Sequence, residues 1–219
     1  MKIQTVTASA LLLDMDGTLV NSDAVVERLW SEWAAVQGLA WGAVEPLIHG
    51  RQGWLTMSLL LPDRPPADNL ADEKRMLDES RVDVAGVVAV PGAGVFLAAL
   101  DGVPHALVTS ADDDLARRRM AAGGLPFPAV AVTAEMVGAS KPDPEGFLLA
   151  ASTLGVDPGA CLVLEDSEAG IAAGLAAGAR VLGVGERAAS YSPTYWVPDF
   201  TAVSVSVAHD GGVRLMLVG

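Results

Sequence analysis

The chain has 219 residues, of which 51% are hydrophobic and 19% are charged, a composition typical of a globular protein with a substantial core. Twenty-seven acidic residues against 14 basic ones give a net charge of −13, which argues against broad electrostatic binding to nucleic acid or an anionic membrane. Because we find neither a secretory signal nor an apolar run of about 18 residues, we expect a cytoplasmic protein.

The first predicted element is a buried strand at Ala8–Leu13, an apolar run that ends in acidic residues. Residues 21–87 then show helical patterns and no convincing strand. The first helix of this segment starts near Ser22, whose side chain is suited to cap it. Further helices are predicted at Ala43–Ile48, Leu55–Leu61 and Asp68–Val82. We therefore expect a helical domain at 21–87, inserted into a core of residues 1–20 and 88–219.

After this insertion, strands and helices alternate. The predicted strands are His105–Thr109, Ala129–Thr133, Ala160–Leu164 and Ala179–Val184. The predicted helices are Gly94–Leu100, Asp113–Ala122, Pro144–Leu154 and Glu168–Ala177. This order is typical of a parallel sheet wrapped by helices, so we predict an α/β fold. Near the end, Val203–Val207 and Val213–Val218 flank a Gly-containing turn around His209 and Asp210, which indicates a β-hairpin.

Two acidic residues follow the first predicted strand within the motif Asp14–Val20. Because side chains alternate along a strand, Asp14 and Asp16 leave it on the same side, and the Gly-Thr turn after them can bring backbone amides to an anion. In a calcium loop the acidic ligands would continue to a Glu at the twelfth position, whereas apolar residues follow here. The pattern therefore disfavours calcium.

A second acidic pair, Glu165 and Asp166, ends the predicted strand Ala160–Leu164. Since the carboxyl ends of parallel strands share one crevice, this pair is expected to lie near Asp14 and Asp16. So many carboxylates in one pocket require a cation. An oxygen-only set with few ligands suits Mg²⁺, which keeps waters and takes further oxygens from a phosphate.

Two further strand ends supply groups that bind phosphoryl oxygens. Thr109 and Ser110 end the strand that begins at His105, and Lys141 precedes the helix that begins at Pro144. A hydroxyl, adjacent amides and a lysine would hold phosphoryl oxygens and offset negative charge beside a nucleophile. Each group is common alone. The order Asp-x-Asp, Thr-Ser, Lys-Pro and Glu-Asp at successive strand ends makes the combination specific.

These four motifs resemble those of the haloacid dehalogenase superfamily over nearly the whole chain. The chain is similar in detail to the capped sugar phosphatases, a group that includes 2-deoxyglucose-6-phosphate, glycerol-3-phosphate and bacterial hexose-phosphate phosphatases. The closer similarity lies in Val26–Trp30, Ile48–Arg51, Lys141–Glu145 and Glu165–Gly174. The resemblance implies a Rossmann-like core with a mobile helical cap, and Mg²⁺-dependent hydrolysis of a small sugar or polyol phosphate.

The resemblance also implies a role for each motif residue. Asp14 would attack the phosphorus and form an aspartyl-phosphate, and Asp16 would protonate the departing sugar oxygen and then activate water. The transferring group would be held by Thr109, Ser110 and Lys141. Asp14, the backbone carbonyl of Asp16 and Asp166 would bind Mg²⁺, and Glu165 would bind it directly or support its ligands.

Selection among substrates is expected to rest on the cap, because the core motifs contact only the phosphoryl group and the metal. The residues expected to face the leaving group are Asn21, His49, Gly50 and Arg51. Asn21 lies near the first linker, and the other three share a loop that can reach sugar hydroxyls when the cap closes.

Three other functions are considered. The β-phosphoglucomutases share the four motifs and a cap, but they hold a second phosphate with an Arg three residues after the cap-loop glycine, a position that is Gly53 here. A non-catalytic sugar-phosphate sensor would need a broken catalytic pair, and both Asp14 and Asp16 are present. The sequence leaves a phosphoglycolate-type phosphatase and the oligomeric state open.

Overall fold

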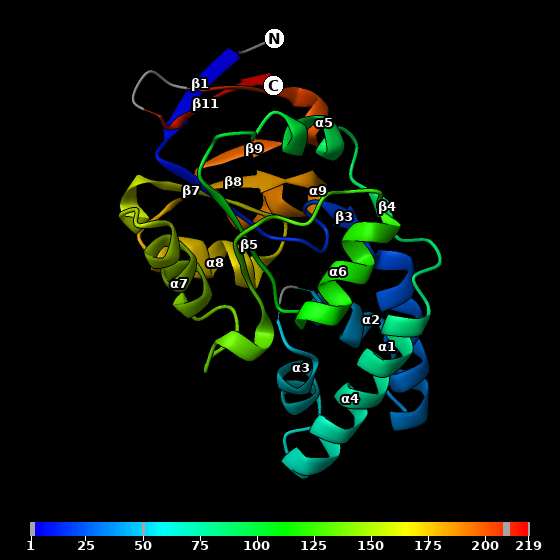
Figure 1. The fold of residues 1–219 in the computed structure, drawn as a ribbon. Helices are drawn as coiled ribbons and strands as arrows, with labels where there is room; N and C mark the ends of the chain where they lie inside the picture. Colours follow the sequence, from blue (N-terminus) through cyan, green and yellow to red (C-terminus); the bar gives the residue numbers. More distant parts are fainter. Residues whose placement is uncertain (1–2, 50, 208–210, 219) are drawn as a thin grey trace.

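A parallel sheet lies at the centre of the computed structural model, which describes residues 3–49, 51–207 and 211–218 (Figure 1). Within these residues the sheet has six strands in the order β6-β5-β2-β7-β8-β9, and all neighbouring pairs are parallel. The strands are β2 (Ala10–Leu13), β5 (His105–Val108), β6 (Ala131–Val132), β7 (Cys161–Glu165), β8 (Arg180–Val184) and β9 (Tyr195–Val197). The predicted α/β fold is confirmed, and β9 is a strand that the sequence analysis did not predict.

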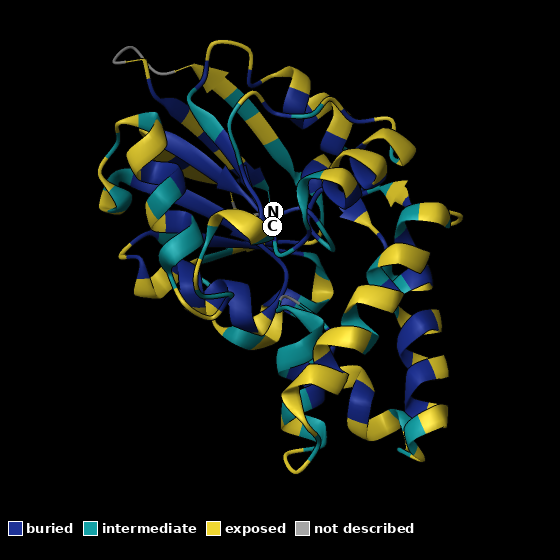
Figure 2. Ribbon diagram, turned by 60° about the horizontal axis from the view of Figure 1, so that its bottom comes forward, coloured by how far each residue is buried: buried dark blue, intermediate teal, exposed yellow. Residues whose placement is uncertain are grey.

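Helices cover both faces of this sheet. Ala10 and Leu12 of β2 pack into one apolar cluster with Phe147, whereas Leu11 and Leu13 belong to the cluster on the opposite face. The core helices are α5 (Ala93–Ala98), α6 (Asp113–Ala122), α7 (Glu145–Leu154), α8 (Glu168–Ala176) and α9 (Gly185–Ala188). Burial on both faces explains why the four central strands, β5, β2, β7 and β8, are mainly apolar, and Figure 2 shows these strands almost entirely buried.

The segment between β3 (Val20–Asn21) and β4 (Val88–Ala89) is helical in its described residues. Its elements are α1 (Asp23–Gln37), α2 (Trp41–Val44), the 3₁₀ turn η1 (Glu45–Leu47), α3 (Gly53–Leu60) and α4 (Pro66–Val82). These helices lie together, to one side of the central sheet (Figure 1). We call this segment the helical insertion. The predicted division into domains of residues 1–20 with 88–219, and 21–87, stays a prediction.

The two linkers of the helical insertion pair with each other. β3 and β4 form an antiparallel ladder in which Val20 faces Ala89 and Asn21 faces Val88. This pair was not predicted, because two-residue strands give no periodicity to detect. The chain thus enters and leaves the insertion side by side.

The start of α1 corrects one prediction. Ser22 occupies the N-cap position, but its side chain makes no cap hydrogen bond to the helix backbone. The Ser22 hydroxyl instead donates to Asp16 Oδ1 at 2.6 Å. The capping role predicted for Ser22 is therefore wrong, because its backbone (φ −112°, ψ 8°) lies outside the extended region that a capping residue adopts.

A second, antiparallel sheet joins the two ends of the chain, in the order β1 (Ile3–Ala8), β11 (Val213–Val218) and β10 (Val203–Val207). Pairing of β10 with β11 confirms the strands of the predicted hairpin, whereas His209 and Asp210 lie outside the described residues. The predicted strand at Ala8–Leu13 is in fact the end of β1 followed by β2. Within the described part of the chain, no helix has both the length and the apolar character needed to cross a bilayer. The cytoplasmic location stays a prediction.

Candidate active site

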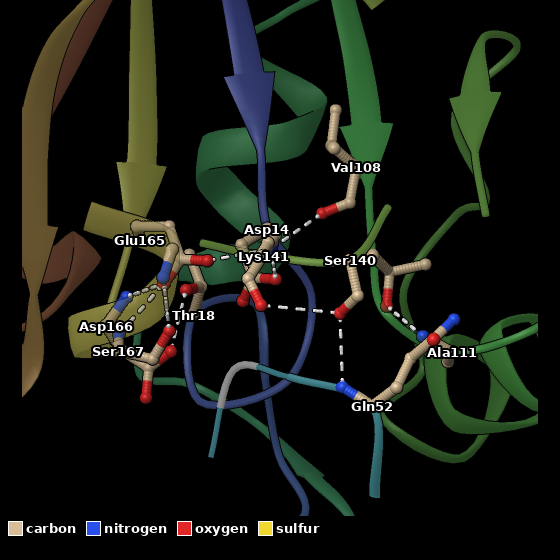
Figure 3. Close-up of polar contacts among 12 residues, drawn as sticks. Asp14, Thr18, Gln52, Val108, Ala111, Ser140, Lys141, Glu165, Asp166 and Ser167 are labelled. Carbon is tan, nitrogen blue, oxygen red and sulfur yellow. Dashed lines mark hydrogen bonds and ion pairs between the residues drawn. The ribbon is translucent and has the colours of Figure 1, made fainter. Parts of the chain in front are cut away.

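The carboxyl ends of three neighbouring strands bring the sequence motifs together. Asp14 directly follows β2, Thr109 follows β5 and Glu165 is the last residue of β7. Because β2 pairs with both β5 and β7, these ends lie at one edge of the sheet. Figure 3 shows the side chains converging there.

Lys141 lies at the centre of this group. Its Nζ is 2.6 Å from Asp14 Oδ1 and 2.7 Å from Glu165 Oε1, and it also donates to the carbonyl oxygen of Val108 at 3.2 Å (Figure 3). Burial alone would lower the pKa of Lys141, but the two carboxylates outweigh burial and hold that pKa above its usual value. The Lys141 side chain is therefore a fixed cation at the floor of the site.

Three buried carboxylates form a cluster beside it. Asp14, Glu165 and Asp166 each offer one oxygen, and these atoms all lie within 4.8 Å of one another. Burial, reinforced by the charge of Glu165, raises the pKa of Asp14 to about 7 and that of Asp166 well above its usual value. A cation held among these oxygens would favour their ionised forms. The set of hard oxygen donors fits Mg²⁺.

Glu165 has both carboxylate oxygens occupied within the protein. Oε1 faces Lys141, and Oε2 accepts from the backbone amides of Asp166 and Ser167, each at 2.8 Å, and from the Ser167 hydroxyl at 2.9 Å. A Cβ at Gly170 would lie 1.6 Å from Glu165 Oε1, so this position of α8 requires a glycine. Glu165 is held in place by these contacts and is suited to supporting its neighbours.

The loop after β2 lies directly against Asp166. Gly17 has a φ of +84°, and a Cβ there would lie 2.1 Å from Asp166 Oδ2. The Thr18 hydroxyl donates to Asp166 Oδ1 at 3.4 Å. The Gly-Thr turn identified in the sequence thus allows the first motif to approach the fourth.

Thr109 and Ser110 form the wall of the site nearest β5. Thr109 is buried, and its hydroxyl accepts from the backbone amide of Ala111 at 3.1 Å. Across from this wall, the backbone amide of Gln52 in the helical insertion donates to the Ser140 hydroxyl at 3.2 Å (Figure 3). The insertion therefore contacts the loop that carries Lys141.

The carboxylate of Asp16 binds two residues outside the carboxylate cluster. Oδ1 accepts from Ser22, and Oδ2 lies 2.8 Å from Nη1 of Arg119 on α6. The sequence analysis missed Arg119, because a run of three arginines resembles a solvent-facing surface. A signal was present: Arg119 shares a helical face with Leu115 and Met120, and all three are buried.

A cavity of about 370 Å³ opens above these residues, between the core and the helical insertion. Its polar lining includes Asp14, Asp16, Thr109, Ser110, Arg119, His49, Arg51, Gln52 and Glu73. The predicted Asn21 is not among the lining residues; it is exposed, and its Oδ1 accepts from the backbone amide of Asp23 at 3.0 Å. Gly50 lies outside the described residues.

Three further groups lie near the site: His49 and Glu73 belong to the helical insertion, and Arg187 belongs to α9 of the core. Of these, only His49 was predicted. Burial and the charge of Arg187 lower the pKa of His49 to about 4, so this imidazole is neutral near pH 7. Arg187 also lies 3.3 Å from Asp166 Oδ2. Burial raises the pKa of Glu73, which accepts from the backbone amide of Trp54 at 3.3 Å.

Comparison with known proteins assigns the family. The family model described as haloacid dehalogenase-like hydrolase matches residues 8–178, a span that contains all four motifs. The chain belongs to the haloacid dehalogenase-like hydrolases. The resemblance predicted from the motifs is therefore confirmed.

Relatives of the chain include proteins named as phosphatases. The chain is 43% identical to Hexitol phosphatase A of Escherichia coli over 79% of this chain and 81% of that protein. It is 31% identical to Fructose-1-phosphate phosphatase YqaB of the same organism, over 78% and 93% of the two chains. A hydrolase structure from Pseudomonas syringae shares the fold, with a TM-score of 0.75, 22% identity and coverage of 89% and 94%.

Proposed function

We propose that this chain is a Mg²⁺-dependent phosphatase that hydrolyses small sugar or polyol phosphates through an aspartyl-phosphate. The observation that carries the proposal is the position of Asp14, beside the Lys141 cation and within the carboxylate cluster, at the base of the cavity. The names of the two Escherichia coli relatives support the substrate class.

Asp14 is the proposed nucleophile, and its attack on phosphorus divides hydrolysis into two displacements. Lys141, Thr109 and Ser110 hold the phosphoryl oxygens, and Lys141 offsets their charge as the bond to the leaving group breaks. Asp16 lines the same cavity and gives a proton to the leaving oxygen, then takes one from water.

The proposed ligands of Mg²⁺ are Asp14, Asp166 and the backbone carbonyl of Asp16. When bound, the ion would polarise phosphoryl oxygens and neutralise charge that develops on them. Glu165 orients Asp166 and Lys141, because its two oxygens are already shared among those neighbours. Of the four residues predicted to bind the metal, Glu165 is therefore proposed to hold the neighbouring groups in place and not to bind Mg²⁺ directly.

We propose that the helical insertion acts as a cap that recognises the leaving group. Arg51 and neutral His49 offer donors to the cavity, and Glu73 offers an acceptor. Such a mixture matches hydroxyl groups, each of which both donates and accepts hydrogen bonds. Asn21 is left out of this site, because it is exposed away from the cavity lining.

The same cavity disfavours two of the alternatives considered above, the phosphomutase and the phosphoglycolate-type phosphatase. A Cβ at Gly53, the position of the phosphate-binding arginine in β-phosphoglucomutases, would lie 3.4 Å from Glu73 Oε1. A second phosphate, or the carboxylate of a phosphoglycolate-type substrate, would meet the negative charge of Glu73 there. An uncharged polyol leaving group avoids this repulsion.

Phosphate release from a panel of hexitol, hexose, glycerol and glycolate phosphates with Mg²⁺ tests the proposal. We expect hexitol or hexose phosphates to be hydrolysed fastest, and Asp14→Asn to abolish turnover because an amide is a far poorer nucleophile. Absence of phosphate release from every ester, or near wild-type turnover by Asp14→Asn, would refute the assignment.

A further inference from the structure

We infer that Arg119 is a positioning residue for Asp16, an assignment that rests on the proposed function. Arg119 lies on α6, outside the four motifs, and lines the cavity. Its Nη1 is 2.8 Å from Asp16 Oδ2, while the Ser22 hydroxyl binds Oδ1 at 2.6 Å. The two oxygens of the carboxylate are thus held from two separate elements of the structure.

The burial of Arg119 points to a function beyond surface charge. Arg119 is only 6% exposed, and its Nε has no hydrogen-bond partner among the described residues. Burying a guanidinium costs free energy that a paired carboxylate only partly offsets, and an apolar residue at this position would pack without that cost. The ion pair with Asp16 is therefore a poor source of stability.

The two arginines that precede Arg119 form ion pairs within α6. Arg117 pairs with Asp113 at 2.7 Å, and Arg118 pairs with Asp114 at 2.9 Å, both one turn earlier on the exposed face of the helix. These pairs stabilise the helix without reaching the cavity. Arg118 therefore offers a matched control for Arg119: the same residue type, one position away, paired with a surface carboxylate.

Positioning matters to Asp16 because of the chemistry proposed for it. An aspartate that exchanges a proton with the leaving oxygen and then with water must point at the same place in both steps. An unrestrained carboxylate on a loop samples several rotamers. Arg119 and Ser22 restrict these rotamers, so loss of Arg119 should slow proton transfer without affecting the nucleophile or the phosphate-binding groups.

The test compares two leaving groups in Arg119→Gln and Arg118→Gln. The first substrate is whichever alkyl phosphate in the panel above wild type hydrolyses fastest, and the second is p-nitrophenyl phosphate, whose leaving group needs little protonation. We expect Arg119→Gln to lower kcat on the alkyl phosphate about 10- to 100-fold with KM within about threefold. The first-turnover burst of p-nitrophenol should keep its rate within about threefold, because Asp16 is needed with this ester only for the later hydrolysis of the aspartyl-phosphate, and Arg118→Gln should match wild type on both substrates.

A double-mutant cycle separates positioning from folding. If Arg119 acts through Asp16, adding Arg119→Gln to Asp16→Asn should cause no further loss on the alkyl phosphate. Equal losses in alkyl phosphate turnover and in the rate of the p-nitrophenol burst, or losses that add to those of Asp16→Asn, would overturn the inference, because Arg119 would then support the fold in general. Should Arg119→Gln fail to fold, Arg119→Lys is measured instead, and its ratio of the two rates decides by the same criterion.

The two proposals fail in different ways. If wild type releases no phosphate from any ester, the proposed function is wrong. If wild type is active and Asp16→Asn impairs it, while Arg119→Gln does not change the ratio between the two substrates, only the assignment of Arg119 is wrong.

Discussion

Arg187 Nη2 lies 2.9 Å from Asp23 Oδ2, which connects a helix of the core to the first residue of α1 in the helical insertion. The other oxygen of Asp23 is 3.8 Å from His49 Nδ1, and the other arm of Arg187 reaches Asp166. Charged groups therefore form a continuous line from the proposed metal site to the loop that we propose faces the leaving group. A change of charge at Arg187 should therefore change the pKa of His49.

Replacing Arg187 with Gln should raise the pKa of His49 from about 4 toward its usual value. The physical reason is that the guanidinium repels a proton on the imidazole, whereas Asp23 attracts one. An NMR titration measures this pKa, with the His49 resonance identified by its absence in His49→Gln. Arg180→Gln, which removes an arginine that contacts Thr7 instead, is the control and should leave the titration unchanged.

Acid stability should depend on His49. The pKa of His49 is 6.5 in the unfolded chain and about 4 in the folded one. Between these pH values His49 is therefore protonated in the unfolded state and neutral in the folded state. This group therefore adds to stability above pH 6.5, and that contribution is lost as the pH falls toward 4. Between pH 7 and pH 5 wild type should lose about 2 kcal/mol more unfolding free energy than His49→Gln. Urea denaturation at the two pH values measures this difference, and equal losses would contradict it.

Mg²⁺ should raise the Tm of wild type. A ligand present at 100 times its Kd stabilises a protein by about 2.7 kcal/mol, which corresponds to roughly 5–10 °C for a chain of this length. Asp166→Asn should lose this shift, because it removes one of three clustered carboxylates. The exposed Asp101 provides the control variant, Asp101→Asn, in which the shift should persist. An equal Tm shift in Asp166→Asn would show that the cation binds at another site.

Arg51→Ala should change substrate choice more than chemistry. Arg51 lines the cavity on its insertion side, so its loss should lower kcat/KM for the preferred sugar phosphate. Hydrolysis of p-nitrophenyl phosphate should stay within about tenfold, a limit of ~1.4 kcal/mol in the barrier. Arg28→Ala removes an exposed arginine paired with Asp83 and should leave both rates unchanged. Uniform loss on every substrate would show that Arg51 is needed for closure or folding.

The sequence predicted which acidic side chains lie together at the strand ends, because the determinants of their positions are local. An apolar run followed by an acidic pair identifies a buried strand and the residue at its end, as at Asp14 and Glu165. Parallel pairing then places those ends together. Apart from β9 and α9, which were not predicted, the strands of the central sheet and the core helices agree with prediction to within a few residues for the same reason.

Residues that depend on distant contacts were not predicted. Arg119 contacts Asp16, and Arg187 contacts Asp166, only once the chain is folded. The residues around each arginine in the sequence do not indicate these partners. Ser22 shows the opposite error: its local pattern indicated a helix cap, and a contact formed by folding took its hydroxyl instead. Local chemistry determines which side chains are available, whereas tertiary structure determines which partner each one binds.

Because β3 pairs with β4, the path of the chain through the core does not depend on the length of the helical insertion. Asn21 and Val88 face each other, at a separation of about 5 Å, which the two-residue turn of an ordinary hairpin can span. Residues 22–87 could therefore be exchanged for a shorter or longer segment without rerouting any strand of the central sheet. With this arrangement, a different segment between Asn21 and Val88 could change the substrate while the residues proposed for hydrolysis stay the same.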